Sequence, residues 1–600
     1  MALELLAPAG SPSALKAACD AGADSVYLGG RWNARVRARN FSDSELKSAF
    51  SFCHARNVKA YVALNVIAFE NELEGIAKYV SDIYEWGADA LIVQDLGVAR
   101  IAREAAPDLP LHASTQMSVH NSKTAKLLGK LGFSRLILAR EADIASANAI
   151  AENSGLEVEV FAHGALCYSY SGKCLFSYVQ TGRSGNRGAC AQLCRLPWKL
   201  YCGGKFVKSG YLTSTKDLSL LQQVPQIAKS RVGCLKIEGR LKDPSYVKRV
   251  VSAYRKAIDT GEASDLSGAS MRGYTGGYLF GDAKRNPLTN PSAHAFSGEK
   301  IGQVVSSGRG GAQIALSGRL SVGDSIRSSS SGKVIQVFRI FQKGRQVDSA
   351  TGSCALLIKT LKKGEAIYRI EKPQAWDDSF LEKIRPAAAG RKASPFAYAK
   401  YEPGFAPLPE MRMFHEWKGE PGKIVPVPLL EDGLLGIVRK IASASSYPAI
   451  SMPRIMFDSE TGAYGKQASE AIESGAKYVF SSEPSTMDIG PTIIDTYANL
   501  SNSYALSQWA GFGRDVRGAV ASIELPGKQA AQLGMLPYFG HTIELMVSEN
   551  DLPSELGIEG KSGCYLSDPR GNRFSISRMG GRTYVTCPFD PGHPIRLSRQ

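Results

Sequence analysis

The chain has 600 residues, of which 44% are hydrophobic and 21% charged. This composition excludes disordered, collagen-like and low-complexity proteins, and at roughly 100–200 residues per domain the length predicts about three domains. No apolar run reaches the roughly 18 residues of a membrane-spanning helix, and the N-terminal segment lacks the basic start of a signal peptide. We therefore expect a cytoplasmic protein without a membrane partner.

The charge is basic and unevenly distributed. The 72 Lys and Arg residues exceed the 56 Asp and Glu residues, which gives a net charge of +16. Residues 299–400 alone hold 18 basic and 8 acidic residues. Such a block favours a polyanionic partner such as RNA; a merely solvated basic surface is the alternative.

The first 260 residues alternate short apolar runs with amphipathic segments. The predicted strands are Leu3–Ala7, Ser25–Leu28, Lys59–Leu64, Ala90–Val93, Leu111–Ala113, Arg135–Leu138, Glu157–Phe161 and Cys234–Ile237. The predicted helices are one that begins at Ser11-Pro12, then Asp43–Arg56, Glu70–Trp86, Leu96–Glu104, Ser122–Leu131, Glu141–Asn153, Asp217–Ser230 and Pro244–Thr260. Eight strand–helix pairs predict an α/β fold, a (β/α)8 TIM-like barrel over residues 1–290. A doubly wound open sheet is the alternative, but no glycine-rich dinucleotide turn follows the first strand.

The C-terminal ends of barrel strands are where catalytic groups lie in such folds. Gln116 follows the fifth strand, His163 the seventh, and Glu238 and Arg240 the eighth. These four are our candidate catalytic residues. Loops are polar in any case, and Glu238 and Arg240 could instead form a structural salt bridge with each other.

A loop rich in arginine follows the second strand. Arg35, Arg37 and Arg39 alternate there with small residues, and guanidinium groups bind carboxylates and phosphates through paired hydrogen bonds. We assign these three to substrate binding, together with Arg183, Asn186 and Arg187 farther along the chain.

The helical period disappears after the predicted barrel and returns in the last 200 residues. Short strands separated by glycine turns over 291–375 predict a small, basic β-barrel, and 376–407 is an expected linker. Residues 408–600 carry a faint repeat of the first barrel: Ala113–Ser118 compares with Ala498–Ser503, Leu138–Glu141 with Ala521–Glu524, and Glu157–Val160 with Thr542–Leu545. We predict a degenerate second α/β barrel there.

Six of the eleven cysteines fall between Cys167 and Cys234. A disulfide framework suits small secreted proteins, and the spacing of Cys167, Cys174, Cys190 and Cys194 does not match the paired knuckles of a zinc ribbon. Several thiolates from one long loop, with one from a distant strand, suit an iron–sulfur cluster. The alternative is a set of buried, unreactive cysteines.

The motif Glu-Val-Phe-Ala-His-Gly-Ala-Leu-Cys at 159–167, with Ser-Gly-Lys-Cys at 171–174, Asn-Arg-Gly at 186–188 and Lys-Ile-Glu-Gly-Arg at 236–240, resembles the signature of the collagenase-like peptidase family U32, of unknown catalytic type. The resemblance is strong over the first 290 residues. The predicted β-barrel after them, and weakly the C-terminal region, also look like the long members of the family, of the type that forms 5-hydroxycytidine in rRNA. Its better understood members are hydroxylation proteins. They form 5-hydroxyuridine in tRNA or 5-hydroxycytidine in large-subunit rRNA, or act in oxygen-independent ubiquinone synthesis.

The resemblance implies a [4Fe–4S] cluster held by Cys167, Cys174, Cys190 and Cys234, with Cys194 as the alternate fourth ligand. It also implies prephenate, a small dicarboxylate, as co-substrate. We therefore expect an RNA-modifying hydroxylase of the rRNA or tRNA type. The alternatives are a collagenase-like peptidase, for which His163 and Cys167 could form a nucleophilic pair, and a non-catalytic RNA-binding assembly factor.

Overall fold

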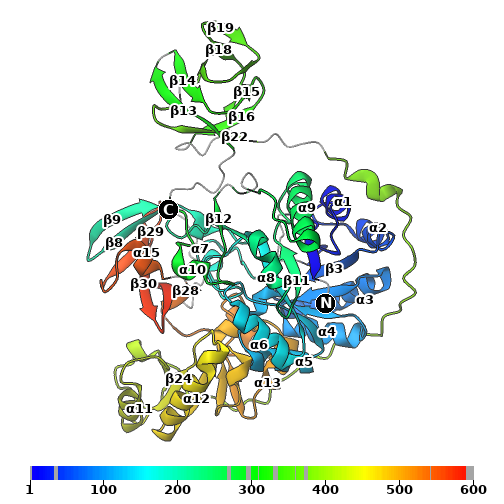
Figure 1. The fold of residues 1–600 in the computed structure, drawn as a ribbon. Coiled ribbons are helices and arrows are strands. Elements are labelled where there is room, and N and C mark those ends of the chain that lie inside the picture. The colour runs from blue at the N-terminus through cyan, green and yellow to red at the C-terminus, as the bar shows by residue number, and fades with distance from the viewer. Residues whose placement is uncertain are drawn as a thin grey trace.

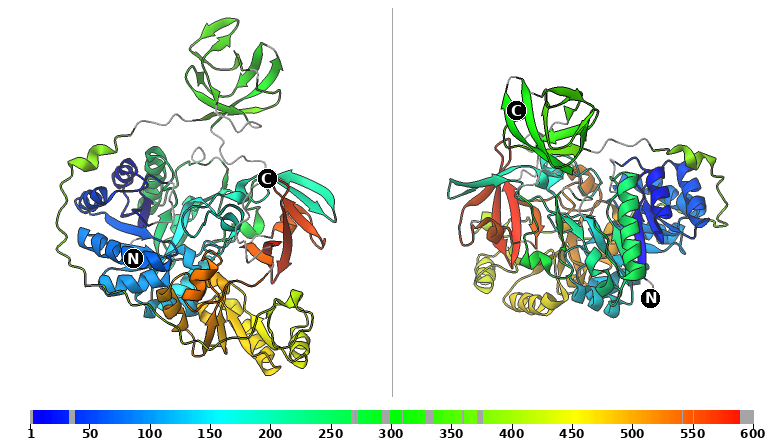
Figure 2. Two further views of the ribbon diagram at one scale, coloured as in Figure 1. Left: turned by 180° about the vertical axis from the view of Figure 1, so that it is seen from behind. Right: turned by 45° about the horizontal axis from the view of Figure 1, so that its top comes forward.

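The computed structural model describes residues 3–32, 38–266, 270, 272–291, 299–308, 310–328, 335–358, 360–370, 376–540, 542–549 and 551–588. It has four units: an N-terminal barrel, a middle antiparallel sheet, a second α/β unit and a six-stranded antiparallel sheet (Figure 1). Figure 2 shows from two further sides that the middle sheet stands off the other three. None of the helices in the described residues combines the length and apolar character needed to cross a membrane.

The N-terminal barrel consists of eight parallel strands in chain order. Its last strand pairs with both the first and the seventh, which closes the sheet. The barrel strands are β1 (Glu4–Pro8), β2 (Ser25–Leu28), β3 (Lys59–Leu64), β4 (Ala90–Val93), β5 (Leu111–Ala113), β6 (Phe133–Ile137), β7 (Glu157–Ala165) and β11 (Val232–Ile237). All eight predicted strands are confirmed, with small shifts at their ends.

Helices cover the outside of the barrel. They are α1 (Pro12–Asp20), α2 (Asp43–His54), α3 (Leu73–Trp86), α4 (Leu96–Ala105), α5 (Ser122–Lys130), α6 (Ile144–Ser154), α8 (Val224–Ile227) and α9 (Pro244–Thr260). Six of the eight, all but α3 and α8, begin at a residue whose side chain caps the first turn. Ser42 and Glu45 form a capping box at the start of α2, which satisfies free amide groups of the first turn. The helix expected at 217–230 is only partly present, because Asp217–Ser219 forms strand β10, antiparallel to β7.

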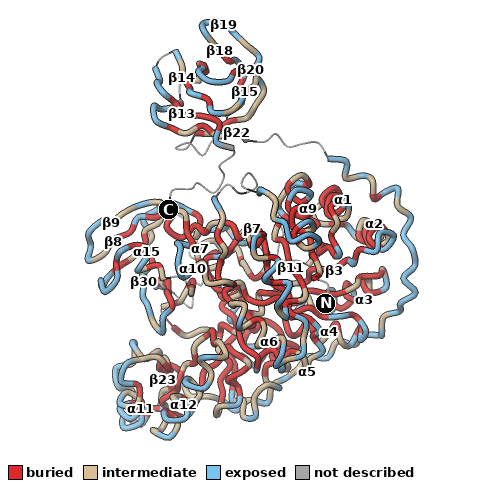
Figure 3. The backbone as a smooth tube through the Cα atoms, viewed as in Figure 1, coloured by how far each residue is buried: buried red, intermediate tan, exposed pale blue. Residues whose placement is uncertain are grey.

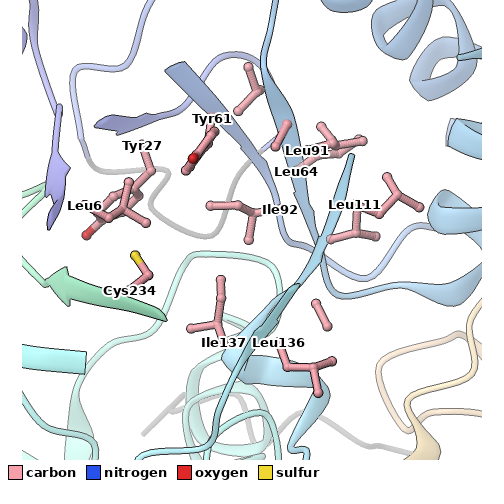
Figure 4. Close-up of a cluster of buried hydrophobic side chains, with 14 of the residues drawn as sticks. Leu6, Tyr27, Tyr61, Leu64, Leu91, Ile92, Leu111, Leu136, Ile137 and Cys234 are labelled. Atoms are coloured by element: carbon pink, nitrogen blue, oxygen red, sulfur yellow. The ribbon is translucent and has the colours of Figure 1, made fainter. Parts of the chain in front are cut away.

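Branched and aromatic side chains fill the barrel interior. Figure 4 shows Leu6, Tyr27, Tyr61, Ile92 and Cys234 directed into one cluster, and the exposed fraction of each is 5% or less. Apolar burial of this kind supplies most of the stability of such a barrel.

The middle unit is an antiparallel sheet that curls around its own apolar cluster. Its strands are β13 (Glu299–Gly308), β14 (Gly311–Leu316), β16 (Ser325–Ser328), β17 (Ile335–Gln336), β18 (Ile340–Gln342), β19 (Arg345–Val347), β21 (Ser353–Leu356) and β22 (Ala366–Ile370), beside the short pair β15 (Leu320–Ser321) and β20 (Ser349–Ala350). The basic residues Arg339, Lys343 and Arg345 are exposed, whereas Lys333 lies outside the described residues.

Residues 376–407, expected to be a linker, form a strap along the outside of the barrel (Figure 1). The strap contains one 3-10 turn, Ser379–Lys383. At its start Ser13 Oγ donates to the Asp378 carboxylate over 2.6 Å, and farther on an Arg391 nitrogen donates to the Ala88 carbonyl over 2.6 Å. Hydrogen bonds at the start and the middle of the strap therefore hold it to the barrel.

The second α/β unit has a five-stranded parallel sheet in the order β23-β24-β25-β26-β27. Its elements are β23 (Ile424–Pro428), α11 (Leu434–Ser443), β24 (Tyr447–Ser451), α12 (Asp458–Glu473), β25 (Tyr478–Ser481), β26 (Thr492–Ile494), α13 (Ser503–Ala510), β27 (Val516–Ala519) and α14 (Gly527–Gln532). It has five of the eight strands of a barrel, and within the described residues this sheet does not close.

The internal repeat is structural, but its register differs from the predicted one. A 3-10 turn, Thr115–Met117, follows β5, and the matching turn, Thr496–Ala498, follows β26. The next residues, Ser118 and Asn499, both adopt the left-handed region, at φ 62° and 60°. In the structure Thr115 thus matches Thr496, whereas the sequence comparison had aligned it with Leu500.

The two α/β units meet through matching helix caps at the C-terminal ends of their strands. Asn121 caps α5 and donates to the Glu483 carboxylate over 3.2 Å. Asn502 caps α13 and donates to the Asp95 carboxylate over 3.0 Å. A Cβ on Gly97 would lie 2.3 Å from Asn502 Oδ1, so only glycine permits this approach. The barrel face on which sites form is therefore covered by the second unit.

The six-stranded sheet joins the chain's end to the segment after the cysteines. In sheet order it comprises β28 (Thr542–Ser548), β31 (Arg582–Pro588), β30 (Arg573–Met579), β29 (Cys564–Ser567), β8 (Trp198–Cys202) and β9 (Lys205–Gly210), with α15 (Leu552–Leu556) beside it. A disulfide between Cys202 and Cys564 links two neighbouring strands. Because β28 belongs here, its predicted match to Glu157–Val160 of the barrel is wrong.

Candidate active site

The four cysteines nearest to one another in sequence lie in a long segment, residues 166–195, between β7 and β8. Apart from helix α7 (Phe176–Thr181) and a 3-10 turn at Leu193–Arg195, the segment is irregular. Backbone amides fix it to the last sheet: Tyr170 donates to the Val547 carbonyl over 2.8 Å, and Leu175 to the Leu545 carbonyl over 2.9 Å. The segment is thus held between the barrel and the six-stranded sheet.

The thiols of Cys167, Cys174, Cys190 and Cys194 lie close enough for charge on one to oppose ionisation of the others. Cys167 and Cys190 expose surface to solvent, and Cys174 and Cys194 are half-buried. Protein atoms still surround the sulfurs closely, and this burial raises the thiol pKa of Cys167, Cys174 and Cys194, that of Cys194 to about 12. A nearby positive centre would be needed to hold them as thiolates.

Cys234 does not lie with these four. It is fully buried in β11, where it pairs with Glu4 of β1, and Figure 4 shows it inside the barrel core. Burial raises the pKa of its thiol well above the usual value, and Glu159 and Glu4 add to the effect. Of the two fourth ligands that the resemblance left open, Cys194 lies with the other three cysteines, whereas Cys234 lies before the C-terminal end of its strand.

Within the described residues no group of three or more His, Cys, Asp and Glu side chains is arranged to hold a metal ion. The donor set consists of four cysteine sulfurs, and the Glu141 carboxylate lies beside Cys167. Iron–sulfur clusters are bound by four cysteine thiolates. The four cysteines are thus of the residue type that such a cluster uses.

Arg140 brings positive charge to the cysteines. It follows β6, lowers the thiol pKa of Cys167 against the larger effect of burial, and donates to Ser171 Oγ over 3.1 Å. Its guanidinium carbon lies 4.1 Å from the centre of the Phe161 ring, and its buried Nε has no hydrogen-bond partner. Arg140 can therefore bind an anion beside Cys167.

His163 is enclosed by aromatic side chains and does not face a nucleophile. Its exposed fraction is 1%. Nδ1 lies 3.4 Å from the Tyr254 hydroxyl and Nε2 lies 3.4 Å from the Tyr274 hydroxyl. Burial lowers the pKa of His163 to about 4, so the imidazole is neutral at physiological pH. This environment is that of a positioning residue below the cysteine segment.

The other candidate catalytic residues lie around the same end of the barrel. The Glu238 amide donates to the His163 carbonyl over 2.8 Å, and the buried Arg240 packs its backbone against Gly10. Gln116 accepts a hydrogen bond from Asn65 over 3.0 Å.

Gln116 lines a cavity of about 50 Å³ between the two α/β units, together with Gln94, Lys173 and Ser482. Burial lowers the pKa of Lys173 to about 8. The predicted residues thus share one end of the barrel, where the second unit leaves Gln116 half-buried.

Two of the predicted substrate-binding arginines are engaged in ion pairs. Arg187 forms a double ion pair with Glu72, at 2.6 and 2.8 Å, and Arg39 pairs with Glu45 at 2.7 Å and with Asp378 at 3.3 Å. These contacts join segments of the chain and do not offer a free guanidinium.

Asn186 is buried, and its carbonyl accepts the Ile67 amide over 3.2 Å. Arg183 is half-exposed, and its carbonyl accepts Ser177 Oγ over 2.5 Å. Arg35 and Arg37 lie outside the described residues.

Glu524, from the loop after β27, is a buried acid that the sequence analysis did not assign to the site. Its exposed fraction is 3%. Burial raises the pKa of its carboxyl to about 7, because Ser184, Arg187 and Asn186 of the cysteine segment offset only part of the desolvation. The repeat contained the signal, since it aligns Glu524 with Glu141, which lies beside Cys167.

The raised pKa of Glu524 predicts a pH dependence of stability. Between the unfolded pKa, near 4.5, and the folded value, about 7, the native state binds the extra proton, so stability falls as pH rises through this window. Glu524→Gln should remove that fall, and relative to the parent it should gain roughly 2–3 kcal/mol between pH 5 and pH 8. Urea unfolding at both pH values measures the gain, with Glu473→Gln, an exposed glutamate of α12, as the control. Equal pH slopes for parent and variant would contradict the assignment.

Comparison with known proteins places the chain in a family. A model described as Peptidase family U32 matches residues 10–288. The chain is 36% identical over 345 residues to the 23S rRNA 5-hydroxycytidine C2501 synthase of Escherichia coli, and the aligned part is 54% of this chain and 52% of the relative. It is 37% identical over 265 residues to tRNA hydroxylation protein P1 of Bacillus subtilis, with 43% of this chain and 63% of the relative aligned. It is 36% identical over 358 residues to an uncharacterized protease of Methanocaldococcus jannaschii, with 54% of this chain and 86% of the relative aligned. The chain therefore spans only about half to two thirds of the length of the first two relatives.

Proposed function

The chain belongs to peptidase family U32, and from this premise we propose that it is an iron–sulfur RNA hydroxylase. The product would be a 5-hydroxypyrimidine: 5-hydroxycytidine in large-subunit rRNA or 5-hydroxyuridine in tRNA. A relative at 36% identity is named a 23S rRNA 5-hydroxycytidine synthase, and one at 37% identity is named a tRNA hydroxylation protein. The observation that carries the proposal is the gathering of four thiols at the catalytic end of the barrel.

We propose that Cys167, Cys174, Cys190 and Cys194 would hold a [4Fe–4S] cluster. Such a cluster, when bound, supplies one-electron chemistry that no protein side chain here offers. The cysteine segment fixes the four residues through its backbone contacts with β28. Arg140 lies beside Cys167, where its positive charge favours the thiolate form.

A small dicarboxylate, for which prephenate is our candidate, would bind beside the same segment. Arg39 and Arg187 are occupied by carboxylates of the chain itself. Arg140 has a buried Nε without a hydrogen-bond partner, and guanidinium groups bind carboxylates through two parallel hydrogen bonds. We therefore infer that Arg140 receives one carboxylate of the co-substrate.

A peptidase activity is less well supported by the geometry. A Cys–His nucleophile needs the imidazole within hydrogen-bond reach of the thiol. Both ring nitrogens of His163 face tyrosine hydroxyls instead, and the ring is buried. One relative is named a protease, so purified protein should also be tested for gelatin cleavage, which we expect to be absent.

Nucleoside mass spectrometry tests the proposed function directly. Deletion of the gene should remove one 5-hydroxypyrimidine from either rRNA or tRNA, and the parent gene should restore it. A gene carrying Cys174→Ser should not restore it, whereas Cys354→Ser, a buried cysteine of the middle sheet, should. An unchanged nucleoside profile in the deletion strain would refute the hydroxylase, and cluster-independent gelatin hydrolysis would favour the peptidase.

A further inference from the structure

The hairpin of β8 and β9 forms the edge of the six-stranded sheet and projects from the body of the molecule (Figures 1 and 3). Side chains alternate between the two faces of a strand. Trp198 and Leu200 of β8 point into an apolar cluster together with Leu566 and Phe574. Lys199, which lies between them, and Tyr201, which follows Leu200, therefore lie on the opposite, outer face.

Three aromatic rings follow one another across that outer face: Phe206 of β9, Tyr201 of β8 and Tyr565 of β29. We call them the aromatic row. Tyr201 and Tyr565 are stacked, with ring centres 5.2 Å apart and an angle of 10° between planes. Phe206 meets Tyr201 edge-on at 5.8 Å. The Arg573 guanidinium carbon lies 5.0 Å from the centre of the Tyr565 ring, which extends the row by a cation.

Phe206 is the open end of the row. The exposed fraction of its side chain is 57%, although phenylalanine side chains are usually buried. Tyr201 and Tyr565 are half-buried because each ring covers its neighbours. One aromatic ring is thus presented to solvent on a rigid support of stacked side chains, strand pairing and the nearby Cys202–Cys564 disulfide.

The charge around the row is strongly positive. Residues 198–210 and 561–578 contain seven Lys and Arg residues and a single acidic residue, Asp568. Lys199, Lys205 and Arg573 are exposed. This excess of cations would not strengthen the binding of an apolar protein partner, whereas it would attract a negatively charged phosphate backbone.

From this combination we propose that the aromatic row is a docking platform for single-stranded RNA. An unstacked base would lie on Phe206, and Lys199, Lys205 and Arg573 would contact phosphates. Proteins that bind single strands use this pairing of stacking rings and cations. The hairpin starts at Trp198, close in sequence to Cys194, so the strand would be held next to the cysteine site. The inference rests on the proposed function for the identity of the ligand.

Binding of a fluorescent oligouridine to the full-length protein, followed by anisotropy, tests the platform. Because a base stacked on an aromatic ring strengthens binding, Phe206→Leu, which keeps apolar area but loses the π face, should weaken binding roughly tenfold. Phe206→Trp should bind at least as tightly as the parent. Because a ring releases no counterions, Phe206→Leu should leave the salt dependence unchanged, while Lys199→Gln and Lys205→Gln should each reduce the log–log slope by about 0.7.

The matched control is Tyr447→Leu, an exposed tyrosine of β24 in the second α/β unit, which should bind as the parent does. Duplex RNA should be insensitive to Phe206→Leu, since its bases are already stacked. Parent-like oligouridine binding by Phe206→Leu, equal losses for single strand and duplex, or no binding by the parent would overturn the platform. The nucleoside assay is independent: Phe206-dependent binding without a missing nucleoside would refute the hydroxylase and leave the platform standing.

Discussion

Cys194→Ser should abolish iron binding, whereas Cys234→Ser should retain it. Cys194 lies with Cys167, Cys174 and Cys190, and a cluster that loses one of four thiolates is expected to be unstable. Cys234 is buried in the barrel core beside Glu4 and Glu159. Its change to serine should affect stability rather than cofactor content.

Iron and acid-labile sulfide, measured after anaerobic purification, check this expectation. The parent should hold about four irons and absorb broadly in the visible range, and Cys354→Ser should match it. Cys194→Ser should be colourless and should fail to restore the modified nucleoside. Retention of iron by Cys194→Ser together with loss in Cys234→Ser would reinstate the ligand set suggested by family resemblance.

The fold was predictable where the local pattern and the tertiary environment agree. The eight barrel strands are short apolar runs buried on both faces, and their helices begin at caps such as Ser42 and Asn121. Prediction failed where distant segments decide the structure. The sequence pattern predicts that Asp217–Ser219 begins a helix, but this segment pairs with β7. Strand β8 pairs with β29, more than 350 residues away, as the Cys202–Cys564 separation of 362 shows.

The site was predictable by residue type but not by partner. The cysteines were recognised from their clustering, and the predicted eighth strand already began at Cys234. The choice between Cys194 and Cys234 still depended on the path of the segment 166–195, which contacts with β28 hold away from Cys234. Arg187 and Arg39 looked like ligand-binding residues because their acidic partners, Glu72 and Glu45, belong to other elements. Which guanidinium is already paired is a property of the packed structure.

The second large effect is expected at the opposite end of the barrel, where Arg135 of β6 joins three carboxylates. Its nitrogens lie 2.6 Å from Glu4, 2.9 Å from Glu157 and 3.3 Å from Glu159. Arg135 and Glu159 are buried. Burial opposes ionisation of Glu4, but hydrogen bonds and attraction from Arg135 outweigh it and lower the pKa of that carboxyl.

Arg135→Met should destabilise the barrel by about 3–5 kcal/mol, because removing one partner of a buried ion pair leaves the other charge uncompensated. The lowered pKa of Glu4 implies stability that is present above pH 4.5 and lost as pH falls through the folded value, so the penalty should shrink in acid. Hydrogen exchange of β6 and β7 peptides, read by mass spectrometry, measures the free energy of unfolding locally. Lys123→Ala, which breaks the exposed pair with Asp488 at 2.7 Å, should cost less than about 1 kcal/mol. Equal costs for the two variants would mean that the charges of the barrel's interior do not stabilise it.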